Sequence, residues 1–257
     1  MTGRDGILTT DNLTRQFGGL IAVSGVSLTL ARGAITAMIG PNGAGKTTTF
    51  NVISGLLPPS EGTVTFDGAD ITGWPAHRIA GLGVARTFQN VQLFPSLNAL
   101  ENVMACRYCR TRSSFLDAVL TLPRDRADRR QMREVAEALL HWVGIWDKRF
   151  LMPGELPYGD QRRLEIARAL ATEPRLIMLD EPSAGMVPAE AKELMDLIVR
   201  LKTRGLSIFL IEHNMNVVMS ISDTVVVLNF GEKIAEGTPV EIRENPDVIE
   251  AYLGAEA

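Results

Sequence analysis

The sequence predicts an α/β fold with a largely parallel sheet, and three observations lead to this prediction. From about residue 34 onward, short apolar runs alternate with longer amphipathic stretches, as strands alternate with helices in parallel sheets. A glycine-rich loop joins one apolar run to a helix, and two adjacent carboxylates close another apolar run. Ligands of open parallel sheets bind beyond the carboxyl ends of the strands. The loop and the carboxylates are therefore expected at one edge of the sheet.

The composition fits a single globular domain over residues 1–257. Hydrophobic residues make up 46% of the chain and charged residues 22%. The net charge of −4 argues against a dedicated nucleic-acid binder, so no nucleic-acid partner is expected. The N-terminus lacks the apolar core of a signal peptide, and the longest apolar runs are too short to span a bilayer. Any membrane role must therefore come through partners. Cys106 and Cys109 lie inside a predicted helix and are expected to be reduced thiols.

The N-terminal segment predicts an antiparallel part of the fold. Ile7–Thr10 and Val26–Leu30 are typical of strands, and Gly62–Phe66 opens a hairpin at a glycine turn. Phe17 lies between the first two strands and is followed by paired glycines. Composition alone favours a core or turn aromatic there, but its place upstream of the glycine-rich loop makes it a candidate for stacking on a nucleotide base. Val23 is a candidate to pack beside the same base.

The glycine-rich loop Gly40–Thr47 fits the pattern Gly-x-x-x-x-Gly-Lys-Thr of a phosphate-binding loop. Ala34–Ile39 before it predicts a buried strand, and Thr47–Ser54 after it predicts a helix. Glycines allow successive N–H groups to point inward, and the helix N-terminus adds its positive dipole end. Lys46 can place a charge against the outer phosphates, and the Thr47 hydroxyl suits Mg²⁺. The loop residues expected to bind the nucleotide are Asn42, Gly43, Ala44, Gly45, Lys46, Thr47 and Thr48.

A helical insert is predicted over residues 90–158, with helices at Leu97–Arg110 and Ala127–Val143. Four arginines fall on one face near the second helix. A solvated face is the favoured interpretation, and contact with anionic lipid or an acidic partner loop is the alternative. These arginines are Arg126, Arg129, Arg130 and Arg133. Further elements are predicted at Arg162–Thr172 (helix), Leu176–Leu179 (strand), Pro188–Arg204 (helix), Ser207–Ile211 (strand), and Thr224–Leu228 with Lys233–Gly237 (paired strands).

Two adjacent carboxylates, Asp180 and Glu181, follow one of these strands. Asp180 suits Mg²⁺ coordination, and Glu181 suits polarisation of an attacking water molecule. His213 follows the next strand, where it could hydrogen-bond a terminal phosphate. A lone histidine is more often structural, but its place beside the loop and the carboxylates favours a role in the site.

These features occur in the order found in the ATP-binding subunits of ABC transporters, which the sequence resembles over almost its whole length. The matching positions are Phe17 at the base-stacking aromatic, Gly40–Thr47 at the phosphate loop, Gln89 at the glutamine loop, Leu156–Asp160 at the signature loop, Leu176–Glu181 at the second nucleotide motif and His213 at the switch histidine. The resemblance implies a P-loop NTPase fold of the ABC ATPase type, with a mostly parallel sheet core, an antiparallel β-subdomain and a helical subdomain. It implies ATP and Mg²⁺ as cofactors, with Gln89 as a further metal-binding and catalytic residue. Residues 1–89 and 159–230 would form the nucleotide-binding core with its β-subdomain, and residues 231–257 a hairpin strand and short helices.

Local motifs resemble the branched-chain amino-acid importer branch of that family. They are Phe17-Gly-Gly-Leu20 with Ala22-Val23, Ala85-Arg-Thr-Phe-Gln89, Tyr158-Gly159 with Gln161-Arg-Arg-Leu-Glu165, Asn245-Pro246 and Ala251-Tyr-Leu-Gly254. The branch implies a subunit that powers import by closing on ATP, as a homodimer or as a heterodimer with a second ATPase subunit. It implies two membrane-spanning permease subunits and an indirect link to an extracytoplasmic amino-acid-binding protein. It also implies a peripheral location at the cytoplasmic face of the bacterial inner membrane.

The signature loop departs from the family pattern. Its residues, implied to contact the ATP held by the second subunit, are Leu156, Pro157, Tyr158, Gly159 and Asp160. Pro157 replaces the usual serine and has neither its hydroxyl nor an N–H. Asp160 replaces the usual glutamine, and an acid there suits a helix start but repels phosphate. We therefore expect a weaker clamp on the terminal phosphate than in typical family members.

Two alternative functions remain open. ATPases of lipid or lipopolysaccharide export have similar sequences, although the long insert near residues 107–133 argues against them. A soluble ABC ATPase of DNA repair or translation typically carries two cassettes or long coiled-coil inserts, whereas 257 residues hold one cassette. A P-loop GTPase is disfavoured because no Asn-Lys-x-Asp base-recognition string occurs.

Overall fold

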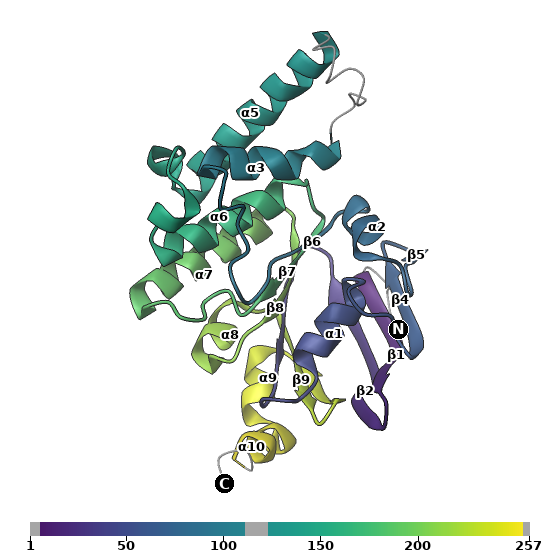
Figure 1. Ribbon diagram of the computed structural model, residues 1–257. Coiled ribbons are helices and arrows are strands. Elements are labelled where there is room, and N and C mark those ends of the chain that lie inside the picture. The colour runs from purple at the N-terminus through teal and green to yellow at the C-terminus, as the bar shows by residue number, and fades with distance from the viewer. Residues whose placement is uncertain (1–5, 111–122, 254–257) are drawn as a thin grey trace.

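The computed structural model describes residues 6–110 and 123–253 and contains two sheets with helices around them (Figure 1). The larger sheet has six strands in the order β10-β9-β3-β8-β7-β6, and its neighbouring pairs are parallel except β9 with β10. Its strands are β3 (Ile35–Ile39), β6 (Val84–Arg86), β7 (Leu176–Asp180), β8 (Ser207–Ile211), β9 (Thr224–Asn229) and β10 (Glu232–Gly237). The mostly parallel sheet core is thereby confirmed.

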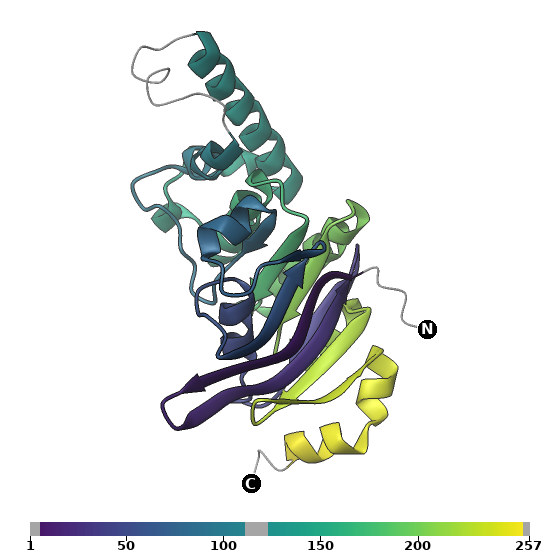
Figure 2. The same cartoon turned by 90° about the vertical axis from the view of Figure 1, so that its right-hand side faces the viewer.

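The smaller sheet is antiparallel, with the strand order β2-β1-β4-β5 (Figure 2). Its strands are β1 (Gly6–Phe17), β2 (Leu20–Ala31), β4 (Glu61–Phe66) and β5 (Ala69–Asp70). The long β1–β2 hairpin turns at Gly18, whose φ of +57° suits a glycine. The predicted antiparallel part of the fold is thus confirmed, with strands longer than the apolar runs that signalled them.

The helices group at one end of the molecule and around the larger sheet. They are α1 (Lys46–Ile53), α2 (Ala76–Gly81), α3 (Ala99–Arg107), α5 (Pro123–Val143), α6 (Tyr158–Ala171), α7 (Pro188–Thr203), α8 (Met215–Ile221), α9 (Pro239–Glu244) and α10 (Pro246–Leu253). Figure 1 shows α3 and α5, which fall in the segment predicted to be a helical insert, at the top of the molecule, and α6 beneath α3. The start of α3 is fixed by a capping box between Asn98 and Glu101. Within the described parts of the chain, no helix is long and apolar enough to cross a membrane.

The inner strands β3, β7, β8 and β9 of the larger sheet are buried on both faces, whereas the edge strand β10 is largely exposed. Successive side chains of the buried strands pack into different cores on opposite faces of the sheet. Ile208 and Leu210 of β8 pack with α3, α5, α6 and α7 on one face. Phe209 and Ile211 pack on the other face with α1, α2 and the antiparallel sheet. This period of two explains why continuous apolar runs, without alternation, signalled these strands. A third, smaller core joins β3 and β9 to α8, α9 and α10.

Several boundaries differ from those predicted. The helix predicted to begin at Arg162 begins four residues earlier, at Tyr158, because Pro157 has the extended backbone of an N-cap and needs no N–H there. The helix predicted from Ala127 begins at Pro123, since proline is well suited to a first turn. β6 and α8 were not predicted, because three and seven residues are too short for a periodic signal. The sequence also predicts that Phe115–Leu122 separates the helices Leu97–Arg110 and Ala127–Val143, and this stretch lies outside the described residues. The subdomain boundaries stay a prediction, and residue 158 falls at the start of α6.

Candidate nucleotide-binding site

Four neighbouring parallel strands deliver the predicted residues to one edge of the larger sheet. The phosphate loop follows β3, Asp180 and Glu181 close β7, His213 follows β8, and Gln89 follows β6. These strands lie in the order β3-β8-β7-β6, and β7 and β8 are paired up to their last residues. The arrangement is the one expected from the carboxyl-end rule for parallel sheets.

The phosphate loop requires glycine at its two ends. Gly40 and Gly45 have φ of +150° and +94°, and a Cβ at Gly45 would lie 2.5 Å from the Ala22 carbonyl oxygen. A Cβ at Gly40 would lie 2.1 Å from the Leu228 carbonyl oxygen. Gly45 is also the N-cap of α1 and supplies no capping side chain. The first N–H groups of α1 are therefore left for an anion, at the positive end of the helix dipole.

The Lys46 side chain turns back against the carbonyl groups of this loop. Its Nζ donates to the carbonyl oxygens of Gly40 at 2.7 Å and Pro41 at 2.9 Å, and the side chain is almost fully buried. Burial lowers the pKa of Lys46, while the charges of Glu181 and Asp180 oppose that shift. The ammonium thus sits between loop carbonyls and the two carboxylates, where an arriving phosphate would be a stronger partner than neutral oxygens.

Asp180 is buried at the end of β7, and burial raises its pKa. The opposing influence is Arg86, whose Nη2 lies 3.1 Å from Asp180 Oδ2. Arg86 also donates to Ser54 Oγ at 2.7 Å, so it ties the end of α1 to this carboxylate. Arg86 was not among the residues predicted for the site. The available signal was a single cation in a short apolar strand just before Gln89.

Glu181, Gln89 and His213 meet at the open side of the site. The Gln89 amide Nε2 donates to Glu181 Oε2 at 2.9 Å, and His213 Nδ1 lies 3.8 Å from the same oxygen. Glu181 has a φ of +46°, which a non-glycine residue adopts at a cost of about 1–3 kcal/mol. Its N–H donates to the Ile211 carbonyl oxygen at 3.0 Å, so β8 holds the strained residue in place. Strain of this kind at a carboxylate is typical of functional sites.

The donor set suits Mg²⁺. Thr47 offers a hydroxyl, Gln89 an amide oxygen and Asp180 a carboxylate, and hard oxygen ligands are the ones that Mg²⁺ prefers. The glycine cradle and the helix N-terminus beside them suit the phosphates to which such an ion binds. The residues present therefore fit a Mg²⁺–nucleotide.

The two predicted base contacts differ in exposure. Phe17 ends β1 with 42% of its surface exposed, and the Arg15 guanidinium carbon lies 4.6 Å from its ring centroid. Val23 is fully buried in the core beneath the phosphate loop. It supports that loop, because its methyl lies near the position that a Cβ at Gly45 would take. Stacking by Phe17 and contact by Val23 stay predictions.

The signature loop is part of a helix start. Pro157 is the N-cap of α6, and Gly159 and Asp160 lie in its first turn. Leu156 is buried, whereas Pro157 and Tyr158 are exposed. Asp160, expected to repel phosphate, forms an ion pair with Lys148 that offsets part of its charge. The Gln161 side chain donates to the Leu156 carbonyl oxygen at 2.9 Å and closes the loop from behind.

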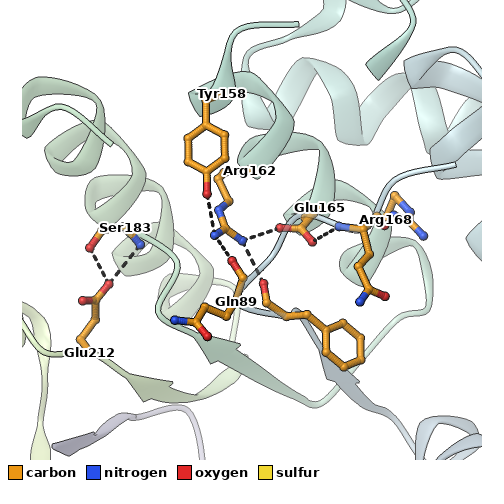
Figure 3. Close-up of polar contacts among 9 residues, drawn as sticks. Gln89, Tyr158, Arg162, Glu165, Arg168, Ser183 and Glu212 are labelled. Carbon is orange, nitrogen blue, oxygen red and sulfur yellow. Dashed lines mark hydrogen bonds and ion pairs between the residues drawn. The ribbon is translucent and has the colours of Figure 1, made fainter. Parts of the chain in front are cut away.

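A second contact that the sequence did not reveal joins the loops after β7 and β8. Glu212 is fully buried next to His213, and its Oε1 accepts from Ser183 N at 3.1 Å and Ser183 Oγ at 2.6 Å (Figure 3). A buried carboxylate is costly unless it is hydrogen-bonded, so this pair fixes the segments that carry Glu181 and His213. A glutamate directly before the histidine was its only signal.

Comparisons with known proteins agree with this geometry. Residues 23–184 match the family model described as ABC transporter. Residues 232–257 match the model described as branched-chain amino acid ATP-binding cassette transporter. The high-affinity branched-chain amino acid transport ATP-binding protein BraF of Pseudomonas aeruginosa is 48% identical over 252 residues, with 96% of this chain and 98% of the relative covered.

Solved structures give the same result. The ADP conformation of an ATP-binding cassette of an ABC transporter is 34% identical with a TM-score of 0.84, covering 97% of this chain and 99% of the other. A dimeric post-hydrolysis state of an ATP-binding cassette, bound to ADP and Pi, is 26% identical with a TM-score of 0.76, covering 90% and 98%. The chain therefore belongs to the ABC transporter family, as an ATP-hydrolysing member of its branched-chain amino acid branch.

Proposed function

We propose that this chain is the ATP-hydrolysing subunit of an importer for branched-chain or similar amino acids. The observation that carries the proposal is the convergence of the phosphate loop, the Asp180–Glu181 pair and Gln89 at the ends of adjacent parallel strands. The similarity to BraF supports the choice of cargo, because that relative is described as a branched-chain amino acid transport protein.

In this proposal the phosphate loop and Lys46 hold the phosphates of ATP, and Phe17 stacks on the base. Thr47, Asp180 and Gln89 hold Mg²⁺, which would neutralise charge on the outer phosphates. Glu181 orients and polarises the attacking water, for which its strained backbone and its amide contact with Gln89 pre-position the carboxylate. His213 is exposed beside Glu181 and steadies the terminal phosphate.

The proposed working form is a dimer of ATPase subunits, either of this chain or of this chain and a related one. Two observations support it. The N-terminal turn of α6 has an exposed edge at Pro157 and Tyr158, and a similar cassette is described as dimeric with ADP and Pi bound. In the closed dimer, residues Leu156–Asp160 of one subunit would face the ATP of the other. Because ATP binds the closed dimer more tightly, its binding and hydrolysis shift the transporter between two states.

The partners in this proposal are two membrane-spanning permease subunits and, through them, an extracytoplasmic amino-acid-binding protein. The chain would work at the cytoplasmic face of the bacterial inner membrane. The permease contact would lie at the apolar residues that follow Gln89, which are Val91, Leu93, Phe94 and Leu97. The exposure of Phe94, at 44% of its surface, supports such a contact. The cargo itself would be selected by the partners, not by this chain.

The test is to purify the chain with its membrane subunits, reconstitute the complex in liposomes and add the binding protein. Leucine, isoleucine or valine is expected to raise ATP hydrolysis several-fold and to be taken up with it, whereas lysine and glutamate are not. Stimulation by lipid substrates without any response to amino acids would replace this proposal with the export alternative.

A further inference from the structure

Three side chains of α6 hold the backbone of the glutamine loop. Arg162 and Glu165 form an ion pair at 2.9 Å, with side chains only 2% and 5% exposed. The pair is continued one turn later by Arg168, which donates to the Gln92 carbonyl oxygen. We call these three residues, Arg162, Glu165 and Arg168, the α6 clamp (Figure 3).

The clamp acts on residues 88–92. Arg162 Nη1 donates to the Phe88 carbonyl oxygen at 2.9 Å, and its Nη2 donates to the Gln89 carbonyl oxygen. Glu165 Oε1 accepts from Gln92 N at 3.1 Å. Two successive carbonyls are thus held by one planar guanidinium, a geometry that lysine cannot reproduce. The glutamine loop follows β6 in the chain, and its backbone is held in place by these contacts with α6.

The same arginine also contacts the signature loop. Arg162 Nη2 donates to the Tyr158 hydroxyl at 2.8 Å, and the Arg162 guanidinium carbon lies 5.3 Å from the Tyr158 ring centroid. Tyr158 is the first residue of α6 and is 38% exposed. On the other side, the Gln89 amide donates to Glu181 Oε2. A contiguous series of contacts thus runs from Tyr158 through Arg162 and Gln89 to Glu181.

A stability role alone does not account for this arrangement. A buried ion pair gives little net stability compared with apolar residues of similar volume, because desolvation offsets its attraction. The pair makes its hydrogen bonds to the glutamine loop and to Tyr158, which lie on opposite sides of Arg162 in the series of contacts.

We propose that Arg162 is a positioning residue that ties the signature loop to the glutamine loop within one subunit. This inference rests on the proposed function, in which Tyr158 faces the ATP of the second subunit. A displacement of Tyr158 at that site moves Arg162, and Arg162 moves the Gln89 amide relative to Glu181. The occupancy of the opposite ATP site thereby sets the geometry of the subunit's own catalytic carboxylate.

A double-mutant cycle on the assembled transporter tests this link. Tyr158→Phe removes only the hydroxyl that contacts Arg162, and Gln89→Ala removes the amide that contacts Glu181 while keeping the carbonyl that Arg162 holds. Tyr158→Phe alone is expected to lower kcat about threefold to tenfold, as the loss of one charge-assisted hydrogen bond would. In the Gln89→Ala background the same change is expected to lower kcat less than twofold, because neighbours that act in series are not additive.

Thr203→Val is the control, since it removes an exposed hydroxyl at the end of α7 that donates to the Arg200 carbonyl oxygen of its own helix. Arg162→Lys, which keeps the charge, should reproduce the kcat loss of Tyr158→Phe, and thermal unfolding verifies that each variant is folded. Additive losses in the cycle, or an unchanged kcat in Tyr158→Phe, would overturn the inference. A wild-type complex that fails to hydrolyse ATP in response to amino acids would instead overturn the proposed function, so the two failures are distinguishable.

Discussion

The phosphate loop and the signature loop are both helix N-termini, and the chain builds them in different ways. The loop before α1 is shaped by its backbone. Gly40 and Gly45 adopt positive φ, and the loop carbonyls accept hydrogen bonds from the Lys46 ammonium. The loop at the start of α6 is held by side-chain contacts. Asp160 forms an ion pair with Lys148, and Arg162 donates to the Tyr158 hydroxyl. Both loops have an exposed edge, at Asn42 and Gly43 in the first and at Pro157 and Tyr158 in the second, so they differ in how they are built and not in exposure.

The difference indicates which substitutions each loop tolerates. A loop built from backbone torsions cannot accept an added Cβ, whereas single side-chain changes around it leave its N–H groups in place. A loop held by side-chain contacts accepts an added Cβ, but a single substitution can change how strongly it binds phosphate. We therefore expect the chain's own half-site to be pre-organised, and the half that it offers to a second subunit to be adjustable.

The largest expected change in kcat is in the chain's own, pre-organised half-site. Glu181→Gln keeps the shape of the side chain and the contact with Gln89 but removes the base, so kcat should fall about 10²–10⁴-fold. ATP affinity should be retained, and ATP-bound dimers should accumulate. Phosphate release and nucleotide titration measure the two quantities. Glu244→Gln, at an exposed carboxylate on α9, is the control, and hydrolysis at the wild-type rate in Glu181→Gln would remove Glu181 from the mechanism.

A matched pair of alanine substitutions compares the loops directly. Gly45→Ala should lower the free energy of unfolding by about 1–3 kcal/mol and weaken nucleotide binding, because a positive φ is strained and the Ala22 carbonyl is too close.

Gly159→Ala should instead raise the free energy of unfolding by about 0.5–1 kcal/mol. It lies within α6, and its Cβ would meet the Glu190 side chain at an ordinary 3.4 Å. Urea denaturation of both variants measures the difference. Equal destabilisation of the two would contradict the contrast between backbone-built and side-chain-built loops.

Phe17→Ala is expected to raise the Kd for ATP about tenfold, within the range for loss of one base–aromatic stack. The ring is exposed at the end of β1, so folding should be unaffected. Nucleotide titration against the isolated chain measures it, with Phe150→Ala as a control at a 59% exposed ring. A Kd equal to that of wild type would mean that the base stacks elsewhere, and the pre-organised half-site would then end at the phosphates.

The functional motifs that are contiguous in the sequence could be predicted, whereas the contacts between residues far apart in the sequence could not. The phosphate loop and the Asp180–Glu181 pair are short strings next to buried strands, so their chemistry and their placement could be inferred together. The Arg86–Asp180 and Arg162–Gln89 contacts join residues 94 and 73 positions apart. No periodicity encodes such contacts, because they depend on strand order and on how α6 packs. The start of α6 was missed for a local reason, since Gly159 has a poor helix propensity that packing overrides.

The smallest effect is expected at the adjustable loop. Pro157→Ser restores a hydroxyl at the N-cap of α6, where serine is favoured and where the proposed dimer places the second subunit's terminal phosphate. We expect kcat of the assembled transporter to rise about threefold, as one added hydrogen bond to a charged group would allow. Pro157→Ala is the control, because it changes the backbone in the same way without supplying an oxygen. If serine and alanine give the same kcat as wild type, the missing hydroxyl does not limit turnover, and the loop's strength must come from the Gly159 N–H and the dipole of α6.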